Sequence, residues 1–208
     1  MRLHTRVLGG VFAATVGLTA AGCGNVVRQG RSPVILVVDS LQASTGGSTS
    51  TAFSTTLLSD VIINVTSPAP CAPATPCPTV FDDPGRATFH LESKDITIAP
   101  STNNQVTLTR VRIAYRRADG RNTPGVDIPY GFDQGVTITV PPSGTASVGF
   151  EMVRHVSKEE SPLVQLIANP NIIHAIADVT FYGTDLVGND VTATSSMSIE
   201  FGNFGDAR

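Results

Sequence analysis

The sequence predicts an all-β fold in which two antiparallel sheets pack face to face as a sandwich. From Ser32 onward the apolar residues come in short runs bounded by Gly, Pro, Asn, Asp and Ser, the pattern of strands rather than helices. Several runs alternate apolar and polar side chains, so each has one dry and one wet face. We therefore expect many short strands, few helices and one sandwich domain over residues 32–208.

The first half of this domain contains three predicted strands. Residues 34–38 form a continuous apolar run, typical of a central strand covered on both faces, and residues 60–65 form a shorter run. Residues 87–92 alternate cleanly between apolar and polar side chains. This third strand is therefore expected to bury one face and to expose the other.

The strand predicted over residues 105–117 changes phase in its middle. Val106 and Leu108 share one parity, whereas the apolar residues from Val111 onward share the other. One extra residue in a strand moves every later side chain to the opposite face. The sequence therefore predicts a β-bulge, or a strand that changes sheets, near Thr109.

Two hairpins are predicted in the second half. Residues 136–140 and 146–152 alternate and are joined by Pro141-Pro142-Ser143-Gly144, a composition typical of turns. Residues 173–181 and 191–201 alternate over a greater length and form a long antiparallel hairpin.

One short helix is expected between the two hairpins. It covers residues 162–168, with Ser161 as its N-cap and Pro162 in its first turn. Alternatively, the helix starts at Ser157, where Glu160 would close a capping box.

The closing hairpin carries a resemblance to a known fold family. It contains Val179-Thr180-Phe181-Tyr182-Gly183-Thr184-Asp185, then Gly188-Asn189 and an alternating strand. This stretch resembles the last two strands of bacterial immunoglobulin-like domains. The resemblance implies an immunoglobulin-like β-sandwich and no particular activity, because such sandwiches serve in adhesion, assembly, carbohydrate binding and purely structural roles.

Residues 1–22 have the composition of a signal peptide. Arg2 and Arg6 precede an uncharged stretch that is too short and too rich in Gly, Ala and Thr for a comfortable membrane span. The stretch ends in Leu18-Thr19-Ala20-Ala21-Gly22-Cys23, which resembles the lipobox of bacterial lipoproteins, with Ala20 where that family favours Leu.

The lipobox resemblance implies cleavage before Cys23 and attachment of lipid, palmitate included, to that cysteine. Residues 23–31 would then tether an exported domain to the cell membrane or the outer membrane. The alternative is an ordinary signal peptidase site, because Ala20 and Gly22 also satisfy the small-x-small rule.

The cysteine count favours the lipid. Cys71 and Cys77 lie six positions apart in a Pro-rich loop and are expected to form a disulfide in an oxidising compartment. Cys23 would otherwise be an unpaired thiol, and acylation gives it a role.

Composition and motifs exclude several function classes. The formal net charge is -3, and it becomes -5 when Arg2 and Arg6 are removed, which makes nucleic acid an unsuitable partner. The sequence has no Gly-rich phosphate loop after a strand, no HExxH, no GxSxG and no paired CxxC. We therefore expect no catalytic residues, no cofactor and no metal.

Weaker site signals remain. His174 and Asp178 lie on one face of their strand, and a solvated sheet face is the simpler interpretation. Two loops offer oxygen ligands for calcium without a known calcium spacing, and their Asp and Asn residues also favour turns. These loop residues are Asp119, Asn122, Asp127, Asp185, Asn189 and Asp190.

The best candidate for a contact surface is a cluster of arginines beside the long loop of residues 118–134. The alternative is that these arginines protect an edge strand from pairing with other chains. An anionic partner such as a glycan, a lipid headgroup or an acidic protein would suit them. The candidate surface consists of Arg110, Arg112, Arg116, Arg117, Arg121, Tyr130 and Phe132.

Taken together, these observations favour a non-catalytic envelope module that acts by contact with an envelope protein or a glycan. Two other classes stay open: a carbohydrate-active or hydrolytic envelope enzyme with an unobvious site, and a periplasmic carrier of a small ligand.

The lipobox gives the first testable prediction. Replacing Cys23 with Ser removes the acylated atom, so the protein should move from the membrane fraction to a soluble fraction. Mass spectrometry of the mature N-terminus checks this directly, and an unmodified Cys23 in the wild-type protein would contradict it.

Overall fold

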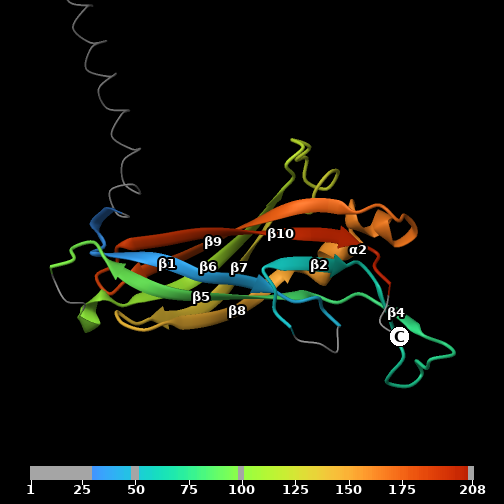
Figure 1. Cartoon of the computed structure of the whole chain (residues 1–208), viewed down its shortest axis with the longest axis horizontal. Helices are drawn as coiled ribbons and strands as arrows, with labels where there is room; N and C mark the ends of the chain where they lie inside the picture. Colours follow the sequence, from blue (N-terminus) through green and yellow to red (C-terminus); the bar gives the residue numbers. More distant parts are fainter. Residues whose placement is uncertain (1–29, 48–51, 98–100, 206–208) are drawn as a thin grey trace, which may run out of the picture.

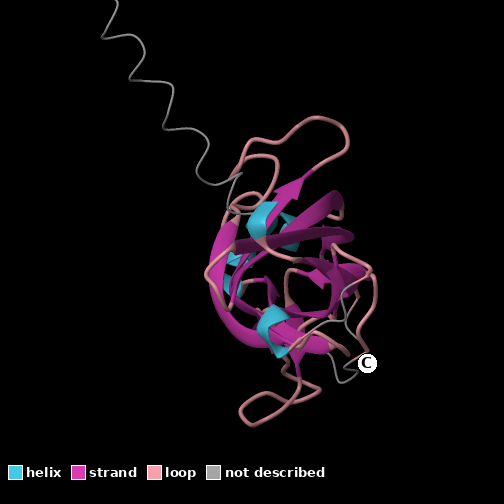
Figure 2. Ribbon diagram, turned by 90° about the vertical axis from the view of Figure 1, so that its left-hand side faces the viewer, coloured by secondary structure: helices cyan, strands magenta, loops and turns pink. Residues whose placement is uncertain are grey.

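Two sheets face each other in the computed structural model, which describes residues 30–47, 52–97 and 101–205 (Figure 1). The predicted signal peptide, Cys23 and most of the predicted tether lie outside these residues. Seen from the end, the strands curve around a common interior (Figure 2). Among the described residues, no helix combines the length and the apolar character needed to cross a bilayer.

The smaller main sheet has three strands in the order β1-β5-β8, and the larger has five in the order β2-β10-β9-β6-β7. The strands of the first are β1 (Val34–Ala43), β5 (Asp83–Ser93) and β8 (Ala146–Val153). Those of the second are β2 (Thr56–Asp60), β10 (Asp190–Gly202), β9 (Ile173–Asp185), β6 (Val106–Arg116) and β7 (Phe132–Val140). The prediction of an all-β sandwich is confirmed, and its immunoglobulin-like subclass stays a prediction.

Two features depart from a sandwich of antiparallel strands alone. β2 pairs with β10 in parallel, from Thr56 beside Ser198 to Asp60 beside Gly202. A third, two-stranded sheet joins β3 (Ile63–Val65) to β4 (Cys77–Thr79) as an arm at one end of the sandwich (Figure 1). The arm contains the Cys71–Cys77 disulfide, so this predicted pairing is confirmed.

The two sheets are joined by aromatic side chains. Phe181 of β9 meets Phe89 of β5 edge to face, with ring centroids 4.7 Å apart, and meets Phe150 of β8 at 5.6 Å. The Tyr115 hydroxyl donates to the Met152 carbonyl at 2.7 Å, and burial raises the pKa of this phenol. The interior of the sandwich is thus filled by large side chains that touch across both layers.

The predicted phase change in β6 is confirmed as a bulge. The pairing of β6 with both neighbours shifts between Leu108 and Arg110, and β6 stays in one sheet. Gly183 lies opposite Leu108, and a Cβ added there would come within 2.4 Å of the Thr107 carbonyl oxygen. The bulge therefore requires a glycine on the neighbouring strand.

Three strand predictions were wrong in detail. β1 is an edge strand whose Ile35 is 49% exposed, because one side of its sheet faces solvent. β7 and β8 do not form a hairpin, since β7 pairs with β6 and β8 with β5. The turn at residues 141–145 carries the chain between sheets. The strand predicted over residues 60–65 is divided, because β2 ends at Asp60 and β3 begins at Ile63.

The helix prediction was also wrong in detail. A short α-helix, α2, covers His155–Glu159, and a 3₁₀ helix, η2, covers Leu163–Ala168. Arg154 and Pro162 occupy their N-cap positions without side-chain capping bonds, so neither the predicted Ser161 cap nor the capping box from Ser157 forms. A third short element, the 3₁₀ helix η1, lies at Thr102–Asn104.

A buried ion pair fastens α2 to the sandwich. Lys158 and Asp83 both have fully buried side chains, and the Lys158 Nζ lies 2.9 Å from the Asp83 Oδ1. Lys158 also donates to the Asp60 carbonyl at 2.8 Å. Asp83 accepts further bonds from the Ser59 hydroxyl at 2.6 Å and the Gly46 amide at 2.8 Å. Burial still raises the pKa of Asp83, because these partners replace only part of its lost hydration.

This ion pair gives the second testable prediction. Lys158→Met leaves the Asp83 carboxylate buried without its cation, so the free energy of unfolding should fall by about 3–5 kcal/mol. Urea unfolding at neutral pH measures the loss.

The matched control is the double variant Lys158→Met with Asp83→Asn. It removes both charges and should recover much of the lost stability, because a neutral amide is cheaper to bury than a lone carboxylate. A double variant as unstable as the single one would show that packing, and not charge, fixes α2.

Candidate functional site

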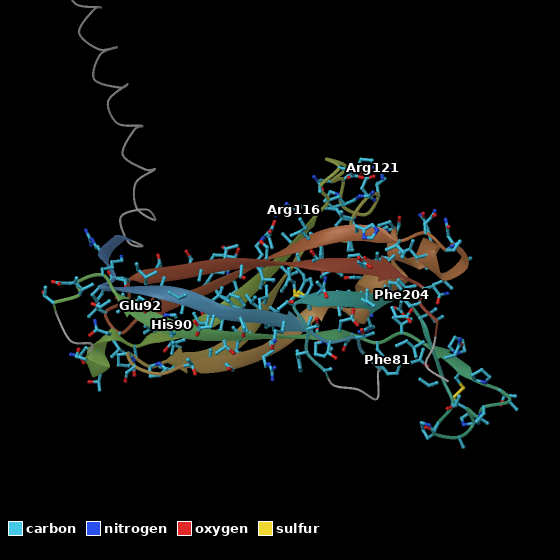
Figure 3. The ribbon with its side chains drawn as sticks, viewed as in Figure 1. Phe81, His90, Glu92, Arg116, Arg121 and Phe204 are labelled. Carbon is cyan, nitrogen blue, oxygen red and sulfur yellow. A yellow bond between two sulfur atoms is a disulfide. The ribbon has the colours of Figure 1, made fainter. Side chains whose placement is uncertain are left out.

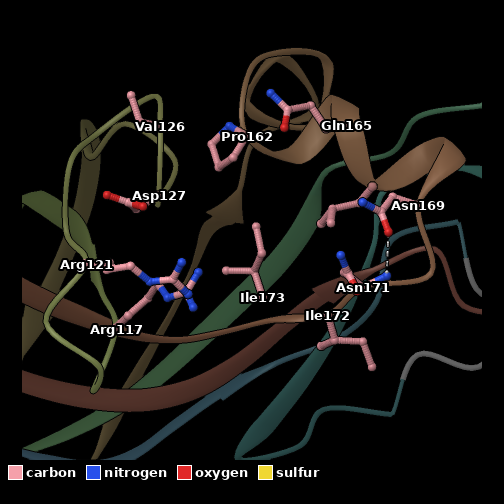
Figure 4. A pocket seen from close by; sticks show the side chains of 11 residues that line it. Arg117, Arg121, Val126, Asp127, Pro162, Gln165, Asn169, Asn171, Ile172 and Ile173 are labelled. Atoms are coloured by element: carbon pink, nitrogen blue, oxygen red, sulfur yellow. Dashed lines mark hydrogen bonds between the residues drawn. The ribbon is translucent and has the colours of Figure 1, made fainter.

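A surface groove lies between the loop of residues 117–131 and the segment 162–173 (Figure 4). Its volume is about 380 Å³. Polar and apolar side chains share its walls, which are formed by Arg117, Arg121, Val126, Asp127, Pro162, Gln165, Leu166, Asn169, Asn171, Ile172 and Ile173. We call this hollow the end groove.

The loop of residues 117–131 is held by its own hydrogen bonds. The Thr123 carbonyl accepts from the amides of Val126 and Asp127 at 3.1 and 2.8 Å. Gly125 has a φ of 77°, and a Cβ there would lie 2.4 Å from the Tyr130 hydroxyl, so the turn requires glycine. Ile128 is 4% exposed and anchors the loop in the core. One wall of the end groove is therefore preformed.

Arg117 and Arg121 share one carboxylate at the groove. The Arg117 Nη2 lies 2.6 Å from the Asp119 Oδ2, and the Arg121 Nη2 lies 3.0 Å from the same oxygen. The hydrogen bond from Arg117 lowers the pKa of Asp119 to about 2. Asp119 is thus ionised at any physiological pH and holds both guanidinium groups in place.

The opposite wall belongs to η2 and the chain that follows it. Leu163 and Leu166 are buried and fix η2 on the core, and Pro162, Gln165 and Leu166 line the groove. The Asn169 side chain then accepts from the Asn171 amide at 3.3 Å (Figure 4). The wall therefore presents amide groups beside apolar side chains.

Exposed apolar side chains belong to both walls. Val126 is 66% exposed on the loop, and Ile172 is 43% exposed on the opposite side. Tyr130, which the sequence placed in the contact surface, is 54% exposed on the same loop. Apolar groups beside fixed polar groups are typical of surfaces that bind a partner.

The structure divides the predicted arginine surface. Arg110 and Arg112 both bind Asp133, at 3.1 and 3.0 Å, and Arg116 binds Asp178 at 2.7 Å. Figure 3 shows Arg116 and Arg121 as separate positions along the upper side of the sandwich. The structure brings Arg117 and Arg121 together at the end groove and leaves the other three on the sheet.

Two parts of the surface prediction were wrong. Phe132 begins β7 rather than ending the loop, it is 7% exposed, and the Arg154 guanidinium covers its ring at 4.1 Å. It therefore belongs to the core. The edge-strand explanation of the arginines also fails, because β6 lies between β9 and β7.

His174 and Asp178, which the sequence places on one face of a strand, do not interact with each other. His174 lies 3.4 Å from Glu200, whereas Asp178 binds Arg116 and Ser196, so the two side chains have different partners. Burial works against ionisation of Asp178, but the bonds from Arg116 and Ser196 lower its pKa on balance.

The oxygen-rich loops use their carboxylates internally. Asp185 accepts from the backbone amides of Val187 and Asn189 and from the Asn189 side chain, at 3.1, 2.8 and 2.8 Å. Within the described ranges, no three His, Cys, Asp or Glu side chains come close enough together to hold a metal ion. The hydrogen bonds of these loops are those of turns.

Sequence reasoning missed half of the end groove. The long irregular loop and its arginines pointed to one wall, whereas nothing marked residues 169–173 as its partner. The Asn-rich stretch Asn169-Pro170-Asn171 was the available signal, since such residues favour exposed turns.

A second hollow, of about 300 Å³, lies at the β6 bulge. There the Arg110 guanidinium stacks on the Tyr182 ring at 3.8 Å, with Gly183 and Asp190 beside it. No aliphatic side chain among the described residues lines this second hollow, whereas the exposed Val126 and Ile172 line the end groove, so the end groove is the better candidate site.

No family model, curated protein or solved structure matches this chain.

The shared carboxylate gives the third testable prediction. Asp119→Ala removes the group that holds Arg117 and Arg121, so trypsin should cut after both arginines several times faster. The melting temperature should change little, because the carboxylate is solvent-exposed.

Asp133→Ala is the matched control, since Asp133 also binds two arginines but these lie within the ladder of β6. It should leave trypsin cleavage of the loop at the wild-type rate. Equal cleavage rates for Asp119→Ala and the wild-type protein would show that the backbone alone holds the loop.

Proposed function

We propose that this chain is a lipid-anchored envelope module that acts by contact, with a protein segment bound in the end groove. The observation that carries the proposal is the groove itself, which joins exposed apolar side chains to polar groups fixed by their own hydrogen bonds. Fixed polar groups lose little conformational entropy on binding, which favours recognition.

The charge balance of the groove favours a protein over an anionic glycan. Arg117 and Arg121 supply two positive charges, and Asp119 and Asp127 supply two negative ones, so the site is close to neutral. A polyanion would find little net attraction there. A peptide segment with an apolar side chain and free amide groups suits Val126, Ile172 and the neighbouring asparagines.

The position of the groove supports the lipid-anchored arrangement. Val106, at the start of β6, pairs with Asp185, whereas Arg116, at its end, pairs with Ile176 near the start of β9. The Ser32 side chain hydrogen-bonds Asp185, so residues 30–33 lie at the start of β6, whereas the loop of residues 117–131 follows its other end. Figure 1 shows the two segments apart. A lipid on Cys23 would leave the groove facing away from the membrane.

The alternative functions receive less support. A small-ligand carrier is expected to enclose an apolar cavity, whereas the end groove is a surface hollow with many polar and charged side chains. A hydrolytic enzyme is expected to bring perturbed carboxylates or histidines together. His174 and Asp178, its sequence candidates, have separate partners.

The fourth testable prediction concerns the groove. The double variant Val126→Asp and Ile172→Asp places charges on both walls, so it should abolish partner binding while leaving the melting temperature within a few degrees. A photo-reactive residue at position 165 measures binding in intact cells, through one cross-linked product that disappears in the variant.

Ile35→Asp is the matched control, because Ile35 is an apolar residue 49% exposed on β1, which belongs to the other sheet. It should leave the cross-linked product intact. A product that persists at full yield in the groove variant would remove the groove from the function, and turnover of an envelope glycan that depends on His174 would replace contact by catalysis.

A further inference from the structure

Two loops at one end of the sandwich carry the two most exposed of the large apolar side chains in the described ranges. Ile96, after β5, is 96% exposed, and Val187, between β9 and β10, is 81% exposed. Leu186, beside Val187, is 54% exposed. Single exposed apolar residues are ordinary, so their position decides whether they matter.

Both loops flank the point at which the described chain enters the sandwich. The Lys94 amide donates to the Pro33 carbonyl at 2.9 Å, and the Lys94 Nζ donates to the Gly30 carbonyl at 3.4 Å. The Ser32 side chain hydrogen-bonds the Asp185 carboxylate. Residues 30–33 therefore touch the base of each loop, and Figure 1 shows the three segments together at the left end.

An aspartate fixes each loop tip. Asp95 accepts from the Thr97 amide at 2.9 Å and the Thr97 hydroxyl at 2.7 Å. Asp185 accepts from the Val187 amide at 3.1 Å. In both turns the carboxylate is bonded within its own loop while the apolar residue after it stays in solvent. The hydrogen bonds thus hold the backbone around Ile96 and Val187 in a defined shape.

We infer that Ile96, Leu186 and Val187 rest in the interface of the lipid bilayer to which the chain is anchored. The inference rests on the proposed lipid at Cys23. Seven residue steps separate Cys23 from Gly30, so this end of the sandwich lies no more than about 25 Å from the anchored residue.

A bilayer suits this surface better than a protein partner does. Three side chains on two narrow tips offer far less area than the roughly 1,200 Å² that a stable protein interface buries in total. Lys94 and Arg31 are exposed at this end, but Asp95, Asp185 and Asp190 lie there as well. The attraction to the bilayer therefore comes from the apolar side chains and not from net charge.

Contact between these loops and the bilayer would fix the orientation of the sandwich relative to the membrane. A single lipid attachment does not fix the tilt of a domain, whereas contacts from two further loops would hold the strands away from the membrane plane. The end groove, at the other end of β6, then faces outward at a fixed height.

The test uses the mature chain with Cys23→Ser and a hexahistidine tag at its N-terminus, bound to phosphatidylethanolamine and phosphatidylglycerol vesicles that contain a nickel-chelating lipid. The tag supplies attachment without acylation. A polarity-sensitive dye is placed at Ile96→Cys or Val187→Cys, with Val126→Cys as the control at the other end. Emission should shift to shorter wavelength on vesicles, and spin-labelled lipids should quench it, at positions 96 and 187 but not at 126.

A second measurement uses unlabelled protein. The triple variant Ile96→Ser, Leu186→Ser and Val187→Ser should keep its melting temperature and lose at least about tenfold in affinity for the same vesicles at limiting nickel lipid. Val126→Ser with Tyr130→Ser is the matched control and should keep wild-type affinity.

The outcomes separate this inference from the proposed anchor. No spectral shift at positions 96 and 187, or a shift equal to that at 126, overturns the membrane contact whether or not Cys23 carries lipid. An unmodified Cys23 in cells, with the shift present, overturns the anchor and leaves the ability of the loop tips to bind lipid established.

Discussion

The arrangement of the far end of the sandwich depends on one buried ion pair. Asp83 begins β5, Lys158 lies on α2, and their partners Ser59 and Gly46 belong to β2 and to the loop before it. One cluster of charge-assisted hydrogen bonds therefore joins both sheets to the helical segment. η2 follows α2 in the chain and forms one wall of the end groove. The position of that wall therefore depends on the ion pair between Lys158 and Asp83.

The sequence predicted the positions of the strands better than it predicted which strands pair with each other. Alternation in β5, β6, β9 and β10 was reliable because one face of each is buried, including the shift at the Leu108–Arg110 bulge. The pairing of the strands was harder to predict from the sequence. The turn at residues 141–145 has hairpin composition, yet it crosses between sheets, because local turn preferences do not say which strand lies beside which.

The candidate site was half predictable for the same reason. Arg117 and Arg121, which line the groove, were among the predicted contact residues because a long loop beside arginines is visible in one stretch of sequence. Lys158 was missed because a charged residue is normally exposed. Its burial is compensated by an ion pair with Asp83, which is distant in the sequence. Phe132 was misplaced because it stands between Gly131 and Asp133, with no apolar run beside it to mark it as the first residue of β7.

The five clustered arginines show how ion pairs in the fold neutralise a positive charge that is conspicuous in the sequence. In sequence they form a positive stretch on an acidic chain, but in the fold Asp119, Asp133 and Asp178 bind all of them. Similar cross-strand pairs, such as Thr107 with Thr139, lie elsewhere on the sheets. In the described part of the chain, the three paired arginines on the sheet have no exposed apolar side chain of the end groove beside them, so the end groove and the loop tips are the better candidates for contact. In the proposed arrangement, the groove at one end would serve recognition and the loop tips at the other would serve attachment to the membrane.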